Sequence, residues 1–276
     1  MDPPSRWALE YVAAGIPHHA SLPTPWKLNV SYWYTGVYES ARMAFRNGQY
    51  RTLLSWTALQ ESGFHIWYRI ANDIMIRFET ENSPLPRLVP ECSGVVLELG
   101  PGPGNQLPRF DRRKIARVVG IETNARFAPD LEASARAAGL EDVYDIVTAR
   151  IEDAAPALER LDVVAGSVDT VLSVQVLCSV ADQARVMELV YGLLKPGGKF
   201  IFWEHTRNSD PVTRVMQSLW NPLWTRFIGG CRLTRDTISA IKSAGEWENL
   251  ESIEGDEQPW TMMPRVWGVL VKPVPA

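Results

Sequence analysis

The sequence predicts an α/β protein with a doubly wound, mostly parallel sheet and a helical extension on its N-terminal side. From residue 94 onward, short apolar runs alternate with segments of helical periodicity, and three closely spaced glycines follow the first run. Parallel strands that are buried on both faces read as continuous apolar runs, with helices between them. Residues 1–90 differ, because they are rich in aromatic residues and contain neither a repeat nor a phosphate-binding loop.

The aromatic-rich region 1–90 is predicted to be helical. No proline occurs between Pro25 and Pro84, and the apolar residues there recur at spacings closer to those of a helix than to those of a strand. This pattern predicts two or three helices. The proline-containing stretch from Asn82 to Pro90 reads as a connector to the next region.

The remaining chain supplies the elements of the sheet. The predicted strands are residues 95–99, 117–121, 143–147, 170–174, 199–203, 247–253 and 266–272, the last of them antiparallel. The predicted helices are residues 104–113, 126–138, 182–194 and 234–244. Lys195-Pro196-Gly197-Gly198 ends the third helix and turns the chain into the next strand.

Composition and charge limit the function classes. With 276 residues, 46% of them hydrophobic, the chain can bury one large core. A net charge of −4 and a pI near 5.7 disfavour a nucleic-acid partner, which requires a basic face. The three cysteines are far apart and form no C-x-x-C pair, so neither disulfides nor a metal site is predicted. No apolar run is long enough for a signal peptide or a membrane span, which predicts a cytoplasmic protein, with peripheral membrane contact left open.

A glycine-rich loop follows the first predicted strand. In the sequence ELGPGPG, Glu98 precedes Gly100, Gly102 and Gly104. Glycines let a chain turn tightly and let its backbone lie against a nucleoside-like ligand, although a purely structural turn is the alternative. The spacing is not the G-x-G-x-x-G of dinucleotide-binding loops, which disfavours a nicotinamide dehydrogenase. A carboxylate at Glu98 would repel a pyrophosphate and attract an ammonium group.

Other polar residues follow the later strands. Glu122 ends the second strand, eighteen residues after Gly104, where an acid can accept hydrogen bonds from both ribose hydroxyls. Glu152 and Asp153 follow the third strand, where they either meet an adenine amine or cap a helix. Gln175 follows the fourth strand at the carboxyl edge of the sheet, where ligands bind in open α/β folds.

Glu204 and His205 end the fifth predicted strand at the same edge and are the candidate catalytic residues. A histidine there has a pKa suited to proton transfer near neutral pH, so His205 is the candidate base. The alternative is a histidine that is hydrogen-bonded to backbone and only shapes the pocket. Cys178 is expected to be a small buried residue and not a nucleophile.

Residues 211–230 form a predicted amphipathic helix within an inserted segment, about 207–232. Its apolar stripe consists of Val212, Val215, Met216, Leu219, Leu223, Trp224 and Phe227. The helix either packs on the core, lies at a membrane surface, or forms a lid over an apolar substrate. As a lid, it would close with the N-terminal helices and present Trp220, Trp224 and Phe227 to the substrate.

These motifs resemble those of class I S-adenosylmethionine-dependent methyltransferases. ELGPGPG is similar to their first motif, VVGIE to their second, and KPGG before an apolar strand to a later one. The resemblance covers about residues 90–273. Within this superfamily, the blocks VLSVQVLCSV, LLKPGGKFIFWEH, GGCRLTRDT and PRVWGVLVK resemble those of the thiol-methyltransferase-like proteins of animals, in the same order.

The resemblance implies a Rossmann-like methyltransferase domain over residues 91–276 and S-adenosyl-L-methionine as its cofactor. It assigns cofactor binding to Glu98, Gly100, Gly102, Gly104 and Glu122, with Glu152 and Asp153 near the adenine. The place of Gln175 at the sheet edge would put it at the methionine or methyl end of such a cofactor. Animal members carry a hydrophobic N-terminal anchor. The N-terminus here is polar and interrupted by proline, so membrane residence is not carried over.

The expected function is methyl transfer to a small apolar acceptor, a thiol or hydroxyl of a metabolite, with specialised biosynthesis as its suggested setting. A thiol with a pKa near 8.5 is already partly ionised at neutral pH, whereas a hydroxyl would depend more on a base such as His205. Two alternatives stay open: a lipid or quinone methyltransferase at a membrane surface, and a non-catalytic scaffold that binds adenosylmethionine. The oligomeric state is not predicted.

Overall fold

The computed structural model describes residues 33–275, so the predictions that concern residues 1–32 lie outside the described residues. The described chain divides into two compact units. The helical unit consists of residues 33–82, Arg207–Arg235 and Glu257–Pro264. The sheet unit consists of Ser83–Thr206, Asp236–Asp256 and residues 265–275.

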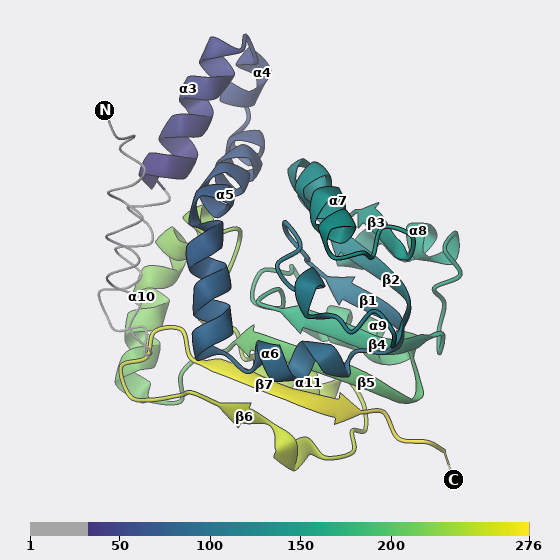
Figure 1. Ribbon diagram of the computed structural model, residues 1–276. Coiled ribbons are helices and arrows are strands. Elements are labelled where there is room, and N and C mark those ends of the chain that lie inside the picture. Colours follow the sequence, from purple (N-terminus) through teal and green to yellow (C-terminus); the bar gives the residue numbers. More distant parts are fainter. Residues whose placement is uncertain (1–32, 276) are drawn as a thin grey trace. The chain divides into compact units, whose positions relative to one another are not determined.

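The sheet unit contains a seven-stranded sheet in the order β3-β2-β1-β4-β5-β7-β6 (Figure 1). Its strands are β1 (Gly94–Leu99), β2 (Ile115–Glu122), β3 (Tyr144–Thr148), β4 (Val168–Val174), β5 (Leu194–His205), β6 (Glu254–Gly255) and β7 (Arg265–Val271). The first five strands pair in parallel and β7 pairs antiparallel with β5, which confirms the predicted fold class. The strand order changes direction between β1 and β4, the position where open α/β sheets bind ligands.

Helices precede or connect these strands. They are α6 (Leu85–Leu88), α7 (Ala128–Ala137), α8 (Ala155–Glu159), α9 (Gln183–Leu193) and α11 (Thr237–Ser243). Three of the four predicted helices correspond to α7, α9 and α11. The prediction of a helix over 104–113 was wrong, because only a 3-10 turn forms there, at Leu107–Arg109. Pro103 and Pro108 lack the N–H groups that an α-helix would need.

The predicted strand at 247–253 was also wrong. That stretch contains a 3-10 turn, Leu250–Ser252, and only the short strand β6 follows it. Asn249 has a left-handed backbone with φ of 57°, which breaks an extended run. Its side-chain Nδ2 donates to the carbonyl oxygen of Val269 at 2.9 Å, so a side chain bonds to β7 where a strand backbone was expected.

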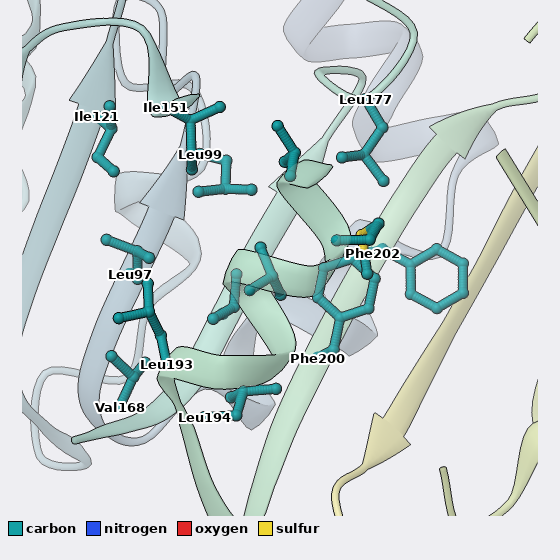
Figure 2. Packing of buried hydrophobic residues seen from close by; sticks show 14 of the residues in the cluster. Leu97, Leu99, Ile121, Ile151, Val168, Leu177, Leu193, Leu194, Phe200 and Phe202 are labelled. Atoms are coloured by element: carbon teal, nitrogen blue, oxygen red, sulfur yellow. The ribbon is translucent and has the colours of Figure 1, made fainter. Parts of the chain in front are cut away.

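One apolar core holds the sheet unit together (Figure 2). Leu97 and Leu99 of β1 alternate with Glu98, so they face this core while Glu98 faces the other side of the sheet. Phe200 and Phe202 of β5 stack at 5.1 Å between ring centroids. The opposite face of β1 and β2 carries Glu98 and Glu122 together with the buried Val96 and Val118.

The helical unit contains a π-helical turn and four α-helices. They are η1 (Trp33–Tyr38), α3 (Glu39–Arg46), α4 (Tyr50–Leu53), α5 (Trp56–Asn82) and α10 (Pro211–Phe227). Buried Trp67 and Ala71 of α5 form a cluster with Phe64, Tyr68 and Phe227, among other residues. The helices predicted for the N-terminal region are therefore present, and α5 packs with the end of α10. No helix of the described chain is long and apolar enough to cross a membrane.

Helix α10 leaves most of its apolar stripe exposed and buries two polar residues together with Trp224 of the stripe. Its buried residues are Thr213, Gln217 and Trp224, whereas four stripe residues are exposed: Val212, Val215, Leu219 and Leu223. Thr213 Oγ1 accepts a hydrogen bond from the backbone nitrogen of Trp260 at 2.9 Å. Gln217 Nε2 donates to the carbonyl oxygen of Met262 at 3.1 Å. The polar face is buried because it satisfies the backbone of segment 257–264.

Candidate functional site

The glycine loop leaves β1 at the centre of the sheet. Gly100 has φ of +53°, and a Cβ placed there would lie 2.7 Å from Cγ2 of Val176, in the loop after β4. Gly102 has φ of +55° with open space around it. Both positions require the left-handed conformation that glycine adopts without strain. The absence of a side chain at Gly100 lets the β4 loop approach the β1 loop closely.

Glu122, at the end of β2, is bonded to this loop. Its Oε2 accepts a hydrogen bond from the backbone nitrogen of Gly102 at 2.9 Å, and its Oε1 accepts one from that of Asn124 at 2.8 Å. Burial raises the pKa of Glu122 above its usual range, and the backbone donors partly offset this rise. The predicted ribose-binding acid and the glycine loop are therefore brought together.

Glu98 lies on β1, and only 2% of its surface is exposed. Its Oε2 accepts a hydrogen bond of 2.7 Å from the hydroxyl of Tyr144 on β3. Burial raises the pKa of Glu98 to about 7, the Tyr144 hydrogen bond acts against this rise, and the charge of Glu122 adds to it. Tyr144 belongs to no recognisable motif, so this partner of Glu98 could not be predicted from the local sequence.

Glu204, at the end of β5, is completely buried. Its Oε1 accepts hydrogen bonds from Ser173 Oγ at 2.7 Å and from the backbone nitrogen of Val176 at 2.9 Å. Its Oε2 accepts one from the backbone nitrogen of Leu177 at 3.0 Å. The carboxylate, expected to be catalytic, is thus engaged in holding the β4 loop, and no motif in the sequence pointed to Ser173 or Val176 as its partners.

Gln175 lies in the same β4 loop and has a left-handed backbone, with φ of 58°. Its backbone nitrogen donates to the carbonyl oxygen of Trp203 at 2.9 Å. A residue other than glycine at positive φ is strained, and such strain is concentrated at functional sites. Together with the Glu204 contacts, this bond fixes the loop at the carboxyl end of β4.

His205 follows Glu204 and is half-buried. It pairs with Arg265 across the antiparallel β5–β7 ladder, and its carbonyl oxygen accepts a hydrogen bond from Thr237 Oγ1 at 2.6 Å. Cys178 is buried, as expected. The backbone of His205 is therefore held from two sides at the carboxyl edge of the sheet.

Glu152 and Asp153 lie in a 3-10 turn after β3 and differ in environment. Glu152 Oε1 accepts a hydrogen bond from the backbone nitrogen of Ala181 at 2.8 Å. Burial alone would raise the pKa of Glu152, but backbone donors and Arg150 outweigh that effect and lower it. The side chain of Asp153 is 73% exposed. Glu152 therefore connects the turn after β3 to the loop that precedes α9, and Asp153 does not.

The predicted lid residues belong to the helical unit. Trp224 is buried, and its Nε1 has no hydrogen-bond partner among the described residues. Phe227 packs edge-on against Trp56, with 6.1 Å between the ring centroids. Arg226 lies 4.5 Å from the centre of the same Trp56 ring. Trp220 is half-buried on α10.

Comparison with known proteins gives a consistent assignment. Residues 97–202 match the family model of a methyltransferase domain. The human thiol S-methyltransferase TMT1A is 34% identical over 109 residues, which are 39% of this chain and 45% of the relative. The human thiol S-methyltransferase TMT1B is 32% identical over 124 residues, or 43% and 49% of the two chains. The chain therefore spans about half the length of these curated relatives.

Solved structures agree on the fold. An O-methyltransferase family protein from Burkholderia thailandensis superposes with a TM-score of 0.56 at 17% identity, covering 86% of this chain and 71% of that one. The matched segment 97–202 includes the glycine loop, Glu122 and the β4 loop. The expected family and cofactor are confirmed: this segment is a class I S-adenosylmethionine-dependent methyltransferase domain that resembles those of the thiol methyltransferases.

Proposed function

We propose that this protein transfers the methyl group of S-adenosylmethionine to a small apolar acceptor, with a thiol as the first candidate. The observation that carries the proposal is the bond between Glu122 and the backbone of Gly102, which joins the acid at the end of β2 to the glycine loop. The partial identity to two human thiol S-methyltransferases supports the choice of a thiol.

Each acid has its own proposed role in binding the cofactor. Glu122 accepts hydrogen bonds from the ribose hydroxyls, using the lone pairs that its backbone donors leave available. Glu98 faces the methionine ammonium, because a buried carboxylate attracts a cation strongly. Glu152 lies nearer the adenine, in the turn that it ties to Ala181. Asp153 has no proposed contact, because its side chain is exposed.

The chain's contribution to the transfer is mainly positional. When bound, adenosylmethionine would supply a methyl group on its sulfonium: the acceptor atom would attack the methyl carbon in line, the carbon–sulfur bond would break, and the sulfur would keep the electron pair in the S-adenosylhomocysteine that leaves. The protein therefore has to hold the acceptor close, aligned and away from water. Gln175, whose backbone is fixed by Trp203, forms part of the wall next to the methyl group.

We assign different roles to the two adjacent residues at the end of β5. His205 is the proposed base, which removes a proton from an acceptor hydroxyl and assists a thiol less, because a thiol is already partly ionised at neutral pH. Glu204 is a positioning residue, because its oxygens are bonded to Ser173 and to the β4 loop inside the protein.

The preference for an apolar acceptor draws on α10. Its exposed side chains include that of Leu219, which is 69% exposed. Exposed apolar side chains grouped on one helix face are typical of a binding surface. The same observation favours the second candidate, a lipid or quinone methyltransferase at a membrane surface.

Two measurements test the proposal. Isothermal titration with S-adenosylmethionine and S-adenosylhomocysteine, with a nicotinamide cofactor as the control ligand, tests cofactor binding. Transfer of a labelled methyl group to alkyl thiols, phenols and amines then identifies the acceptor. We expect thiols to be methylated by both the wild type and His205→Gln, and any activity on phenols to be lost in His205→Gln. No binding of either cofactor form by folded protein would overturn the proposal.

The membrane alternative has a separate test. Neutral and anionic phospholipid vesicles are sedimented with the protein. Recovery of the protein with the vesicles, together with methylation of a membrane-embedded quinone and not of free thiols, would replace the thiol proposal by the second candidate.

A further inference from the structure

Tyr144 joins three strands on one face of the sheet. It starts β3 and pairs in register with Val118 of β2, while Gly120 of β2 pairs with Glu98 of β1. Residues two apart on a strand share a face, so Tyr144, Gly120 and Glu98 lie on the same side. The Tyr144 hydroxyl reaches Glu98 Oε2 at 2.7 Å, across the middle strand.

Gly120 leaves room for this crossing. A Cβ at Gly120 would lie 2.3 Å from the hydroxyl oxygen of Tyr144 and 2.9 Å from its Cζ, closer than real Cβ contacts allow. A glycine inside a strand often marks the close approach of another group. Here the tyrosine ring passes where every other residue type would place a side chain.

The hydrogen bond has a defined electrostatic effect on Glu98. Glu98 is buried next to a second acid, Glu122, and both circumstances favour its neutral form. A hydroxyl that donates to a carboxylate favours the charged form instead. Burial, the charge of Glu98 and the bond to Glu98 raise the pKa of Tyr144 well above its usual value, so its hydroxyl keeps the proton that it donates.

We propose that Tyr144 is a positioning residue that keeps Glu98 ionised and oriented toward the methionine ammonium of the cofactor. The inference rests on the proposed role of Glu98 in binding the cofactor. Tyr144 itself touches neither the cofactor nor the acceptor in this assignment. Tyr144 acts only through Glu98, which its hydroxyl can reach because Gly120 has no side chain.

Tyr144→Phe tests this inference, because it removes the donor and keeps the ring. The affinity for S-adenosylmethionine is measured by titration calorimetry between about pH 6 and about pH 9 for wild type and variant. Without the donor, Glu98 becomes ionised only at higher pH. We expect the dissociation constant to rise about tenfold at the acidic end and to approach that of the wild type at the alkaline end. At each pH, the dissociation constant of the variant is divided by that of the wild type. Ionisation of the ligand's own amino group affects both constants equally, so it does not change this ratio.

A second ligand separates this role from a merely structural one. 5′-Methylthioadenosine keeps the adenine and ribose and lacks the amino-acid portion. Its affinity is expected to be the same in wild type and Tyr144→Phe. A loss of affinity for both ligands that is constant with pH would mean that Tyr144 only supports the fold, which would overturn the inference.

Three further variants complete the test. Glu98→Gln removes the titrating group, so adding Tyr144→Phe to it is expected to have no further effect on affinity. Gly120→Ala is expected to displace the Tyr144 hydroxyl and to reproduce the pH-dependent loss. Tyr191→Phe removes a hydroxyl that donates to the backbone carbonyl oxygen of Glu246 elsewhere in the sheet unit, and this variant should bind normally. If the wild type binds no adenosylmethionine, the proposed function fails; if it binds and the ratio does not vary with pH, only this inference fails.

Discussion

Glu122 Oε2 accepts a hydrogen bond of 2.9 Å from the backbone nitrogen of Gly102, and this bond connects the ends of two adjacent parallel strands. Because Glu122 is buried and Gly102 has no side chain, the carboxylate and the loop backbone lie next to each other and are held by a bond within the protein. Such preorganisation reduces the ordering cost of binding.

We expect Glu122→Ala to weaken adenosylmethionine binding by about ten- to a hundredfold, since hydrogen bonds to a charged group are worth about 1.5–3 kcal/mol. Titration calorimetry measures the effect. Glu132→Ala, which changes an exposed acid on α7, is the matched control and should bind as the wild type does. Equal affinity in the two variants would remove Glu122 from the cofactor site.

Three glycine-to-alanine substitutions separate backbone strain from steric overlap. Gly100, Gly102 and Gly139 all have positive φ, but only Gly100 has a neighbour within 4 Å of the added Cβ. Gly102→Ala and Gly139→Ala should each lower the free energy of unfolding by about 1 kcal/mol. Gly100→Ala should cost clearly more, about 3 kcal/mol, because it also displaces Val176. Urea denaturation measures all three, and equal losses would contradict the role of Val176.

Glu204→Ala should destabilise the protein by about 3 kcal/mol or more, because it leaves buried donors without an acceptor. The donors are Ser173 Oγ and the backbone nitrogens of Val176 and Leu177. Glu204→Gln keeps one acceptor oxygen and should lose less. Thermal unfolding measures both, with the exposed Glu188→Ala as control. A stable but inactive Glu204→Ala would instead support a direct catalytic role.

Glu98 should make the stability of the ligand-free protein depend on pH. Its pKa is raised from 4.5 to about 7, so folding favours the protonated form. The stabilisation is complete below the unfolded pKa and is lost as the pH rises through about 7. The shift corresponds to an order of about 3 kcal/mol. We therefore expect Glu98→Gln to gain stability relative to wild type between about pH 5 and about pH 8, as measured by urea denaturation. A pH-independent difference would contradict the raised pKa.

Leu219→Gln should leave the free energy of unfolding within about 0.5 kcal/mol of the wild type, because the side chain is exposed. Binding of adenosylmethionine should also be unchanged. Urea denaturation measures the stability. Thr225→Ala, on the same helix, is the control for helix stability. A clearly larger loss of stability in Leu219→Gln would contradict the exposure of this side chain.

The strands could be predicted because each one is a local apolar run. The first five were located to within a few residues, and β7 was identified with its antiparallel direction. The failures were at residues 104–113 and 247–253, where prolines and the left-handed Asn249 outweigh the local pattern. Helix α10 was located correctly, whereas the burial of its polar residues Thr213 and Gln217 could not be predicted, because it depends on bonds to a segment about 45 residues away.

The sequence by itself determined which apolar runs form the strands. It also determined the glycine loop and the acids at or near the ends of β1, β2 and β5, since these features depend on residue type and spacing. Only the tertiary structure decided how each acid is used. Glu122 bonds to the glycine loop, Glu204 bonds to the β4 loop, and Glu98 bonds to Tyr144. A glycine inside a strand, such as Gly120, indicates that another group approaches the backbone closely. That this group is Tyr144 depends on the register of three strands. Hydrogen bonds between residues distant in sequence are set by that register, which no local pattern encodes.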